Sequence, residues 1–241
     1  QFADAVSQAV RWVIALAPFG IMGLVFDSVS QNGLSIFVDY GKLLLVLVGC
    51  MLFIALVVNP IIAFVCLKKN PYPLVFRFLE ESGITAFFTR SSAANIPINM
   101  QLCEKLGLNK DLYSVSIPLG ATINMDGTAI MQGVATIFIA QVYGIDLGMT
   151  EMLTVVLTAV LVSIGTAGVP GVGLIMLAMV LSSVGLPVEG IGLILGIDRL
   201  TDMARTALNI TGDAACALLI SEQEKSQEVV AVEKDDLETA I

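Results

Sequence analysis

The chain has 241 residues and a formal net charge of −9, and 56% of the residues are hydrophobic while only 14% are charged. A soluble domain carries about 25% charged residues, so this composition excludes an ordinary soluble protein and predicts an integral membrane protein. The sequence has no histidine and no basic cluster, and its four cysteines lie far apart. These features exclude a histidine-based triad, a zinc site and nucleic-acid binding.

Two long apolar stretches open the chain. Residues 5–27 and about 40–66 each reach the length of about 20 residues that a membrane-spanning helix needs. The second stretch ends in a short basic loop with Lys68, Lys69 and Arg77, which the positive-inside rule assigns to the cytoplasmic side. Because the chain begins without methionine and inside the first stretch, we expect it to be a piece of a longer protein.

A polar segment with a proline follows at about 74–104. Its apolar parts are too short to cross a bilayer, and its centre carries Arg90, Ser91, Ser92 and Pro97. Irregular backbone at membrane depth is tolerated only where protein or a wet cavity surrounds it. We therefore predict a first re-entrant helical hairpin whose tip contains these residues.

The next stretch, 111–142, is long and apolar but is interrupted by G120ATINMDGTA. Asn124, Asp126 and Thr128 lie among the glycines of this interruption. A broken membrane helix exposes backbone carbonyls, and together with a buried carboxylate these groups form the expected architecture of a cation site.

A second hairpin is predicted at 152–187. No charged residue occurs between Met152 and Val188, yet the middle of the segment reads S163IGTAGVPGVG. The glycines and proline make a continuous helix implausible, and each flanking arm is too short to cross a bilayer alone. The segment therefore predicts a second re-entrant hairpin.

The helix predicted at 190–220 carries a polar stripe in apolar surroundings. Asp198, Asp202, Arg205, Asn209 and Asp213 follow one another at spacings of four, three, four and four, which place them on one side of a helix. A charge at the bilayer centre costs roughly 2.5–3.5 kcal/mol on insertion scales, so the stripe predicts a polar pocket with bound partners. The acidic tail at 221–241 is expected to be disordered.

Together these segments predict an all-α integral membrane protein with two re-entrant hairpins, each followed by a helix with buried polar residues. That recurrence is typical of an inverted-repeat secondary transporter with its site at the membrane midplane. The predicted units are a scaffold-type helix and loop (1–39), transport-domain helices and hairpins (40–220), and the tail (221–241).

Four motifs in order carry a resemblance to a known family: T89RSS, P118LGATINMDGTA, S163IGTAGVPGVG and D198xxxDxxRTxxNxTGD. The chain resembles the glutamate/aspartate transporter family of dicarboxylate/amino acid:cation symporters, over nearly its whole length before the tail. The resemblance implies co-transported sodium ions, an elevator-type mechanism, a homotrimer, and a multi-pass place in a bacterial or archaeal cell membrane.

Sodium prefers hard oxygen ligands, and Asp126 and Asp213 are the candidate carboxylates. The resemblance implies three sodium sites. The first has carbonyls of Gly120, Asn124 and Asn209 with the Asp213 carboxylate. The second has Thr122 with carbonyls of Ser163, Ile164 and Thr166, and Asn124 and Asp126 contribute to the third. The alternative is that Asp126 and Asp213 only pair with neighbours and hold helices together.

An amino acid offers an ammonium, which suits the Asp202 carboxylate, and an acidic side chain, which suits the fork of Arg205. The resemblance assigns these roles to both residues. The alternative is an internal Asp202–Arg205 ion pair that opens for the substrate. For Arg90 two alternatives stay open: it faces the same anion-binding space as Arg205, or it pairs with an acidic side chain of the protein. The remaining predicted substrate-binding residues are Ser91, Ser92, Thr128, Thr206, Asn209, and backbone groups of Val169, Pro170, Gly171 and Gly173.

Within this family, Asp202 favours an amino acid over a C4-dicarboxylate, Arg205 favours an acidic side chain, and Asp213 favours sodium over protons. The first hairpin, A86FFTRSSAANIPINMQLCEKL, instead looks close to the bacterial serine/threonine transporter branch. Sodium-coupled symport of glutamate or aspartate is therefore the main prediction, and a serine/threonine or C4-dicarboxylate symporter is the alternative. A channel does not need paired ion and substrate sites, so the pairing favours a transporter over a channel. The sequence shows no nucleophile–base pair of the kind that an enzyme would use.

Overall fold

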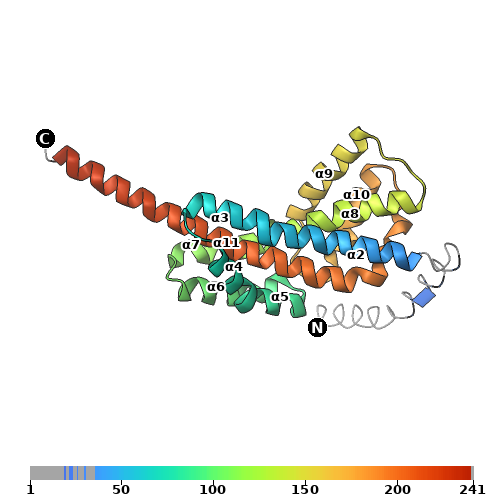
Figure 1. The fold of residues 1–241 in the computed structure, drawn as a ribbon, viewed down its shortest axis with the longest axis horizontal. Helices are drawn as coiled ribbons and strands as arrows, with labels where there is room; N and C mark the ends of the chain where they lie inside the picture. The colour runs from blue at the N-terminus through green and yellow to red at the C-terminus, as the bar shows by residue number, and fades with distance from the viewer. Residues whose placement is uncertain (1–18, 20–21, 24–25, 27–29, 31–35, 240–241) are drawn as a thin grey trace, which may run out of the picture.

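The computed structural model describes residues 19, 22–23, 26, 30 and 36–239, and this part of the chain consists of helices joined by turns, without a strand (Figure 1). The all-α prediction is confirmed over these residues. The helix predicted at 5–27, and with it most of the unit predicted at 1–39, lies outside them.

One uninterrupted helical rod begins the described region. It comprises α2 (Ile36–Phe53), the π-helical turn η1 (Ile54–Val58) and α3 (Asn59–Leu67). Its 30 residues from Val38 to Leu67 are long and apolar enough to cross a membrane, which holds for no other helix in the described ranges. The predicted span at about 40–66 is thus a helix of the required length.

Pro60 explains the π-helical turn inside this rod. Proline has no N–H to donate, and its ring crowds the carbonyl one turn earlier, which here belongs to Leu56. The hydroxyl of Tyr72 donates to that Leu56 carbonyl oxygen at 3.3 Å. The defect in the rod therefore also anchors the start of the next helix.

The segment predicted as the first hairpin forms two helical arms joined by a tight turn. The first arm runs through α4 (Tyr72–Phe78), η2 (Leu79–Gly83) and α5 (Ile84–Thr89), and the second is α6 (Ser92–Lys105). Helix–turn–helix geometry is thereby confirmed here, whereas entry into a membrane from one side stays a prediction.

The turn of this first hairpin is made by two residues with special backbone roles. Arg90 ends α5 in the left-handed region with a φ of 55°. Ser91 then starts α6, because its hydroxyl oxygen accepts a hydrogen bond from the Ala94 N–H at 3.2 Å and so caps the helix. At the opposite end of the arms, Lys105 donates to the Glu81 carboxylate at 2.7 Å.

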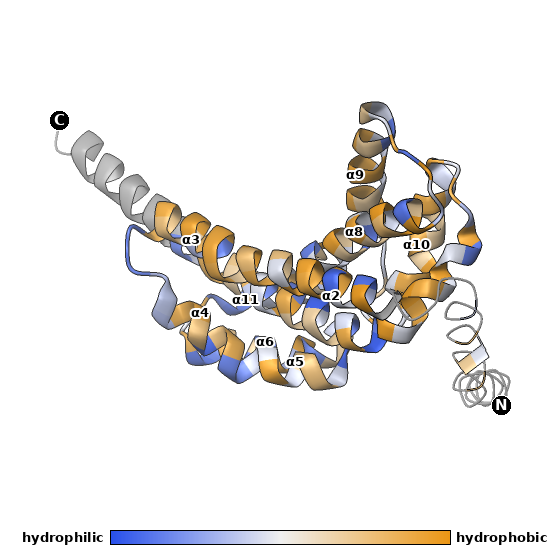
Figure 2. Cartoon of the chain, turned by 45° about the vertical axis from the view of Figure 1, so that its right-hand side comes forward, coloured by the Kyte–Doolittle hydropathy of each residue, from blue (hydrophilic) through white to orange (hydrophobic). Residues whose placement is uncertain are grey.

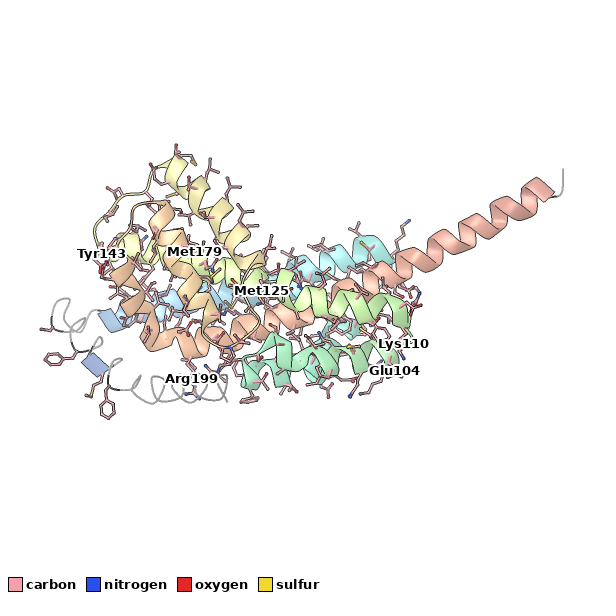
Figure 3. The ribbon with its side chains drawn as sticks, turned by 180° about the vertical axis from the view of Figure 1, so that it is seen from behind. Glu104, Lys110, Met125, Tyr143, Met179 and Arg199 are labelled. Carbon is pink, nitrogen blue, oxygen red and sulfur yellow. The ribbon has the colours of Figure 1, made fainter. Side chains whose placement is uncertain are left out.

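The predicted broken helix is also confirmed. Helix α7 (Lys110–Ile123) and helix α8 (Asp126–Val142) are separated by Asn124 and Met125, whose backbones are not helical. Figure 3 shows Met125 between Lys110 and Tyr143, and Met125 is only 4% exposed. The break therefore lies deep within the fold.

The second hairpin consists of α9 (Met149–Ile164) and α10 (Val172–Ser183). The hydroxyls of Thr158 and Ser183 lie 3.2 Å apart across the two arms. A short 3-10 turn, η3 (Val188–Gly190), leads into α11 (Ile191–Thr239).

Helix α11 extends from Ile191 to Thr239 and so runs through most of the segment that was expected to be a disordered tail. Two factors account for this. Glu, Lys, Gln and Ala have high helix propensity, and extending an existing helix avoids the cost of nucleation. Composition alone indicated a solvated segment, because composition takes no account of the helix that precedes this segment.

Helix α11 is the central element, against which most of the other helices of the described region pack, while α9 packs on α8 and α10 (Figure 1). One buried cluster joins it to α2, α8 and α10 and includes Leu47, Met131, Ile139, Leu177 and Ile194. A second cluster joins it to the first hairpin and α7 and includes Phe78, Leu102, Ile117 and Leu218. Hydrophobic residues also cover the outer faces of α2, α3 and α9 (Figure 2), as expected of surfaces in contact with lipid.

The crossing of α8 and α11 gives a test of this packing. A Cβ at Gly127 would lie 2.8 Å from the backbone of Arg205, whereas a Cβ at Gly133, on the same helix, meets nothing within 4 Å. Gly127→Ala should destabilise the full-length protein by about 1–3 kcal/mol through overpacking, seen as a lower thermal midpoint in detergent. Gly133→Ala serves as the matched control and should keep or raise the midpoint. Equal midpoints would contradict this close helix crossing.

Candidate functional site

The predicted stripe on α11 faces the protein interior. Asp202, Arg205, Asn209 and Asp213 expose only 2–3% of their surface, while Asp198, at the outer end of the stripe, is half-buried. Buried charges need compensating partners, so the partners of these side chains define the site.

Asp202 lies between two guanidinium groups. Arg205, one turn along α11, donates from Nη2 to Asp202 Oδ1 at 2.6 Å. Arg90, at the tip of the first hairpin, places Nη1 3.7 Å from Asp202 Oδ2. The internal pair, weighed above as the alternative to substrate binding, is therefore present, and Arg90 joins it.

Two buried atoms of this pair remain without a hydrogen bond in the described structure, Asp202 Oδ2 and Arg205 Nη1. A buried polar group left unsatisfied costs about 1–3 kcal/mol. One atom is an acceptor and the other is a donor. A ligand that brings an ammonium and an oxygen acceptor would satisfy both at once.

A small cavity of about 10 Å³ adjoins the pair, close to the volume that one water molecule needs. It is lined by parts of both hairpins, the broken helix and α11. The lining includes most of the predicted substrate-binding residues: Arg90, Ser92, Thr128, Val169, Gly173, Asp202, Arg205, Thr206 and Asn209. Ser91, Pro170 and Gly171 are not part of this lining.

Met125, Ala167 and Gly168 also line the cavity, and the sequence analysis did not include them. Met125 contributes its sulfur, which accepts a hydrogen bond from Asn209 Nδ2 at 3.1 Å. Its position in the middle of the helix break was the one available signal, but an apolar side chain gives no indication of a polar contact.

Gly168 is the point where the two hairpins and the broken helix meet. Its carbonyl oxygen accepts from the Ser91 hydroxyl at 3.0 Å and from the Ala93 N–H at 3.1 Å. A Cβ at Gly168 would lie 2.8 Å from Ser92 Cβ and 3.0 Å from the Ala121 carbonyl oxygen. Only glycine allows this approach, so Gly168 holds the cavity closed.

Asn209 satisfies the polar groups that the helix break leaves free. Its Oδ1 accepts from the Gly127 N–H at 2.8 Å, and its backbone carbonyl accepts from Asn124 Nδ2 at 3.1 Å. Its Nδ2 approaches Thr128 Oγ1 at 3.3 Å. The first N–H groups of a helix lack partners within that helix, so this side chain caps α8 from a neighbouring helix.

The first predicted sodium site stays a prediction, and the structure shows the surroundings of its carboxylate, Asp213. A Cβ on Gly120 would fall 1.7 Å from Asp213 Oδ1, so the carboxylate fills the space beside that glycine. The carbonyl of Asn209, one turn before Asp213 on α11, accepts a hydrogen bond from Asn124 Nδ2 at 3.1 Å. Asp213 Oδ2 is buried without a hydrogen-bond partner among the described residues. A buried carboxylate with a vacant acceptor, near backbone carbonyls, fits the hard oxygen ligands that a sodium ion prefers.

The residues of the second predicted sodium site differ from Asp213 in their surroundings. Thr122 is exposed, and its hydroxyl donates to the Leu119 carbonyl at 2.8 Å. Ser163 and Thr166 are buried, and their hydroxyls donate to carbonyls of α9. Ile164, at the end of α9, is 43% exposed. This ligand set stays a prediction.

Asp126, which was expected to be a buried carboxylate, is exposed in the described structure, and its part in a cation site stays a prediction. It is the first residue of α8, where the positive end of the helix dipole favours an acid. Its neighbour Gly127, rather than Asp126, faces α11. The sequence spacing did not reveal which side of the break each residue faces.

The chain is similar in sequence to known proteins. The sequence model of the sodium:dicarboxylate symporter family matches residues 1–223. A serine/threonine transporter SstT from Streptococcus agalactiae is 55% identical over 218 residues, 88% of this chain and 54% of the relative. One from Bifidobacterium adolescentis is 52% identical over 221 residues, 89% of this chain and 51% of the relative. The chain thus spans about half the length of these relatives.

The meeting point at Gly168 can be tested with a matched pair of variants. Gly168→Ala should weaken substrate binding to the full-length protein by about tenfold, because overpacking costs roughly 1–3 kcal/mol and the hairpin tips cannot close. Gly165→Ala, in the same tip, is the control, since its nearest atom is the Val162 carbonyl at 3.9 Å. Binding is measured by calorimetry. Similar affinities for both variants would refute the role of Gly168.

Proposed function

The chain belongs to the sodium:dicarboxylate symporter family, and from this membership and the geometry of its site we propose that it takes part in sodium-coupled symport of serine or threonine. The named relatives are serine/threonine transporters, which favours the alternative over the main prediction of an acidic substrate. The proposal rests chiefly on the two unsatisfied atoms of the Asp202–Arg205 pair.

These two atoms match the groups of an amino acid. The substrate ammonium donates to Asp202 Oδ2, and a substrate oxygen accepts from Arg205 Nη1. The side-chain hydroxyl of serine or threonine faces the hydroxyls of Thr128 and Thr206, both buried at the cavity. Each substrate group thus finds a partner of opposite hydrogen-bonding character.

The internal ion pair supports a substrate without an acidic side chain. Arg205 already neutralises Asp202 at 2.6 Å, and its guanidinium packs against Gly173, where a Cβ would lie 2.5 Å from Nη1. A carboxylate side chain at Arg205 Nη1 would add a second acid to the guanidinium that already neutralises Asp202, and so would leave less compensation for Asp202. A hydroxyl side chain requires no such exchange of charged partners.

Asn209 provides the link between ion and substrate. Its carbonyl, one turn before Asp213 on α11, accepts from Asn124 in the helix break, and its amide faces the cavity. Sodium at Asp213 fixes the break at Asn124 and Met125, and this positions Met125, Thr128 and Asn209 for the substrate. Ion and substrate therefore stabilise the same closed arrangement, which is the thermodynamic condition for coupling.

Movement across the membrane belongs to the same proposal. Sodium and a zwitterionic substrate neutralise the buried charges, and only the neutralised, closed unit crosses the low-dielectric barrier. The elevator-type motion of residues 40–220, the re-entrant hairpins and the homotrimer are proposed from the resemblance stated above. The multi-pass membrane location follows from the same family membership.

Substrate identity is tested by uptake of labelled serine into proteoliposomes that contain the full-length protein. An inward sodium gradient should drive uptake, and excess unlabelled threonine should suppress it while excess aspartate leaves it intact. Replacing sodium by potassium on both sides is the control for coupling. Suppression by aspartate but not threonine would restore the acidic substrate, and uptake without sodium would refute the coupling.

A second prediction concerns the cation site. Asp213→Asn should raise the sodium concentration for half-maximal serine uptake by at least about tenfold, because it removes the one charged ligand of the first predicted sodium site. A charged partner contributes about 1.5–3 kcal/mol. Asp146→Asn, in the exposed turn after α8, is the matched control and should behave as the unchanged protein. An unaltered sodium requirement in Asp213→Asn would remove Asp213 from the ion site.

A further inference from the structure

A groove of about 430 Å³ lies between α2 and α8, away from the site described above. Its apolar lining is formed by Leu43, Val46, Val134, Ile137, Phe138 and Val142. Asp39, Lys42 and Gln141 line it as well. A volume of this size lies within the range of about 300–1,000 Å³ that ligand-binding pockets have.

The polar residues of the groove gather at one end. Asp39 lies in the first turn of α2 and Lys42 about one turn later, and Gln141 lies in the last turn of α8. Val46 and Val134 lie one to two turns further along their helices, at 1.5 Å per residue. The groove therefore changes from polar at the membrane surface to apolar toward the bilayer interior.

Asp39 and Lys42 provide one negative and one positive charge at this end. Lys42 Nζ lies 3.0 Å from Asp39 Oδ1, and the two side chains are 71% and 45% exposed. An exposed pair of this kind contributes only about 0–1 kcal/mol, so a ligand can take over both charges at small cost. The pair matches a molecule that carries a phosphate and an ammonium close together.

We propose that this groove binds a phospholipid of the phosphatidylethanolamine class. The phosphate contacts the Lys42 ammonium, the lipid ammonium donates to the Asp39 carboxylate and to the Gln141 amide oxygen, and one acyl chain lies along the apolar lining. The surroundings support a lipid, since neighbouring side chains of α2, such as Leu45 at 74% and Leu52 at 53%, are exposed hydrophobics on a membrane span.

Headgroup chemistry separates this lipid from other phospholipids. A choline headgroup has no N–H to donate to Asp39, and an anionic glycerol headgroup places its charge near the Asp39 carboxylate without an ammonium to offset it. Charge-assisted hydrogen bonds are roughly twice as strong as neutral ones. The Asp39–Lys42 pair therefore favours a primary ammonium next to a phosphate.

The bound lipid would connect two elements of the main core. Leu43 and Phe138 line the groove and also belong to the buried cluster that joins α2, α8 and α11. The rings of Tyr40 and Phe138 lie 6.0 Å apart beside it. An acyl chain here extends the contact between α2 and α8, so its binding stabilises the fold.

Lipid retention by the full-length protein tests this proposal without reference to transport. The protein is purified in mild detergent, stripped of lipid, and supplied with equal amounts of ethanolamine, choline and glycerol phospholipids, and the bound species are quantified by native mass spectrometry. We expect about tenfold enrichment of the ethanolamine lipid. Asp39→Asn should remove that preference, and Lys42→Gln should weaken binding of all three lipids.

A matched pair of tryptophan variants locates the lipid. Val46→Trp fills the groove and should abolish the enrichment, whereas Leu45→Trp, on the adjacent outward-facing position, should leave it unchanged. Equal enrichment in both variants would overturn the proposal, as would preferred retention of the glycerol lipid. Absence of bound lipid, with a cysteine at position 46 shielded from thiol reagents, would show that protein covers the groove instead.

Discussion

Asn209 is the residue on which the rest of the site depends. One side chain and its own carbonyl satisfy polar groups on both sides of the break between α7 and α8. In a membrane interior an unsatisfied backbone group costs several kcal/mol, so the break persists because α11 presents these partners to it. On α11, Asn209 lies one turn after Arg205 and one turn before Asp213, between the Asp202–Arg205 pair and the predicted cation carboxylate.

The same rule explains the other irregular positions of the chain. Tyr72 takes the carbonyl that Pro60 leaves free in the long rod, and the hairpin tips satisfy one another through Gly168 and Ser91. The buried polar atoms without a hydrogen bond in the described residues include Asp202 Oδ2 and Arg205 Nη1 at the cavity and Asp213 Oδ2 at the predicted cation site, and the others belong to Asn95, Ser116, Gln132, Asp198 and Ser221. A fold that satisfies its structural defects but leaves the atoms of Asp202, Arg205 and Asp213 free is suited to bind a charged ion and a zwitterion.

Much of this architecture was predictable because it follows from local rules. Glycine and proline marked the second hairpin turn and glycine marked the helix break, whereas the first hairpin turns at Arg90 and Ser91 and Pro97 lies inside α6. The four-three-four-four spacing placed the stripe on one face of α11. Features that depend on contacts between distant segments were not predictable. Spacing alone did not reveal the Gly168 junction, the sulfur contact of Met125 or the exposure of Asp126. It also left open whether Arg205 pairs with Asp202 or with a substrate, and that choice bears directly on the substrate.

The central proposal is that sodium at Asp213 and substrate in the cavity are coupled through Asn209. Calorimetric titration of serine into the full-length protein at a series of sodium concentrations measures that coupling directly. We expect serine affinity to rise with sodium concentration. Asn209→Ala should reduce this dependence on sodium more than it reduces serine affinity at saturating sodium. Serine binding that is independent of sodium, or a sodium dependence untouched by Asn209→Ala, would contradict the proposal.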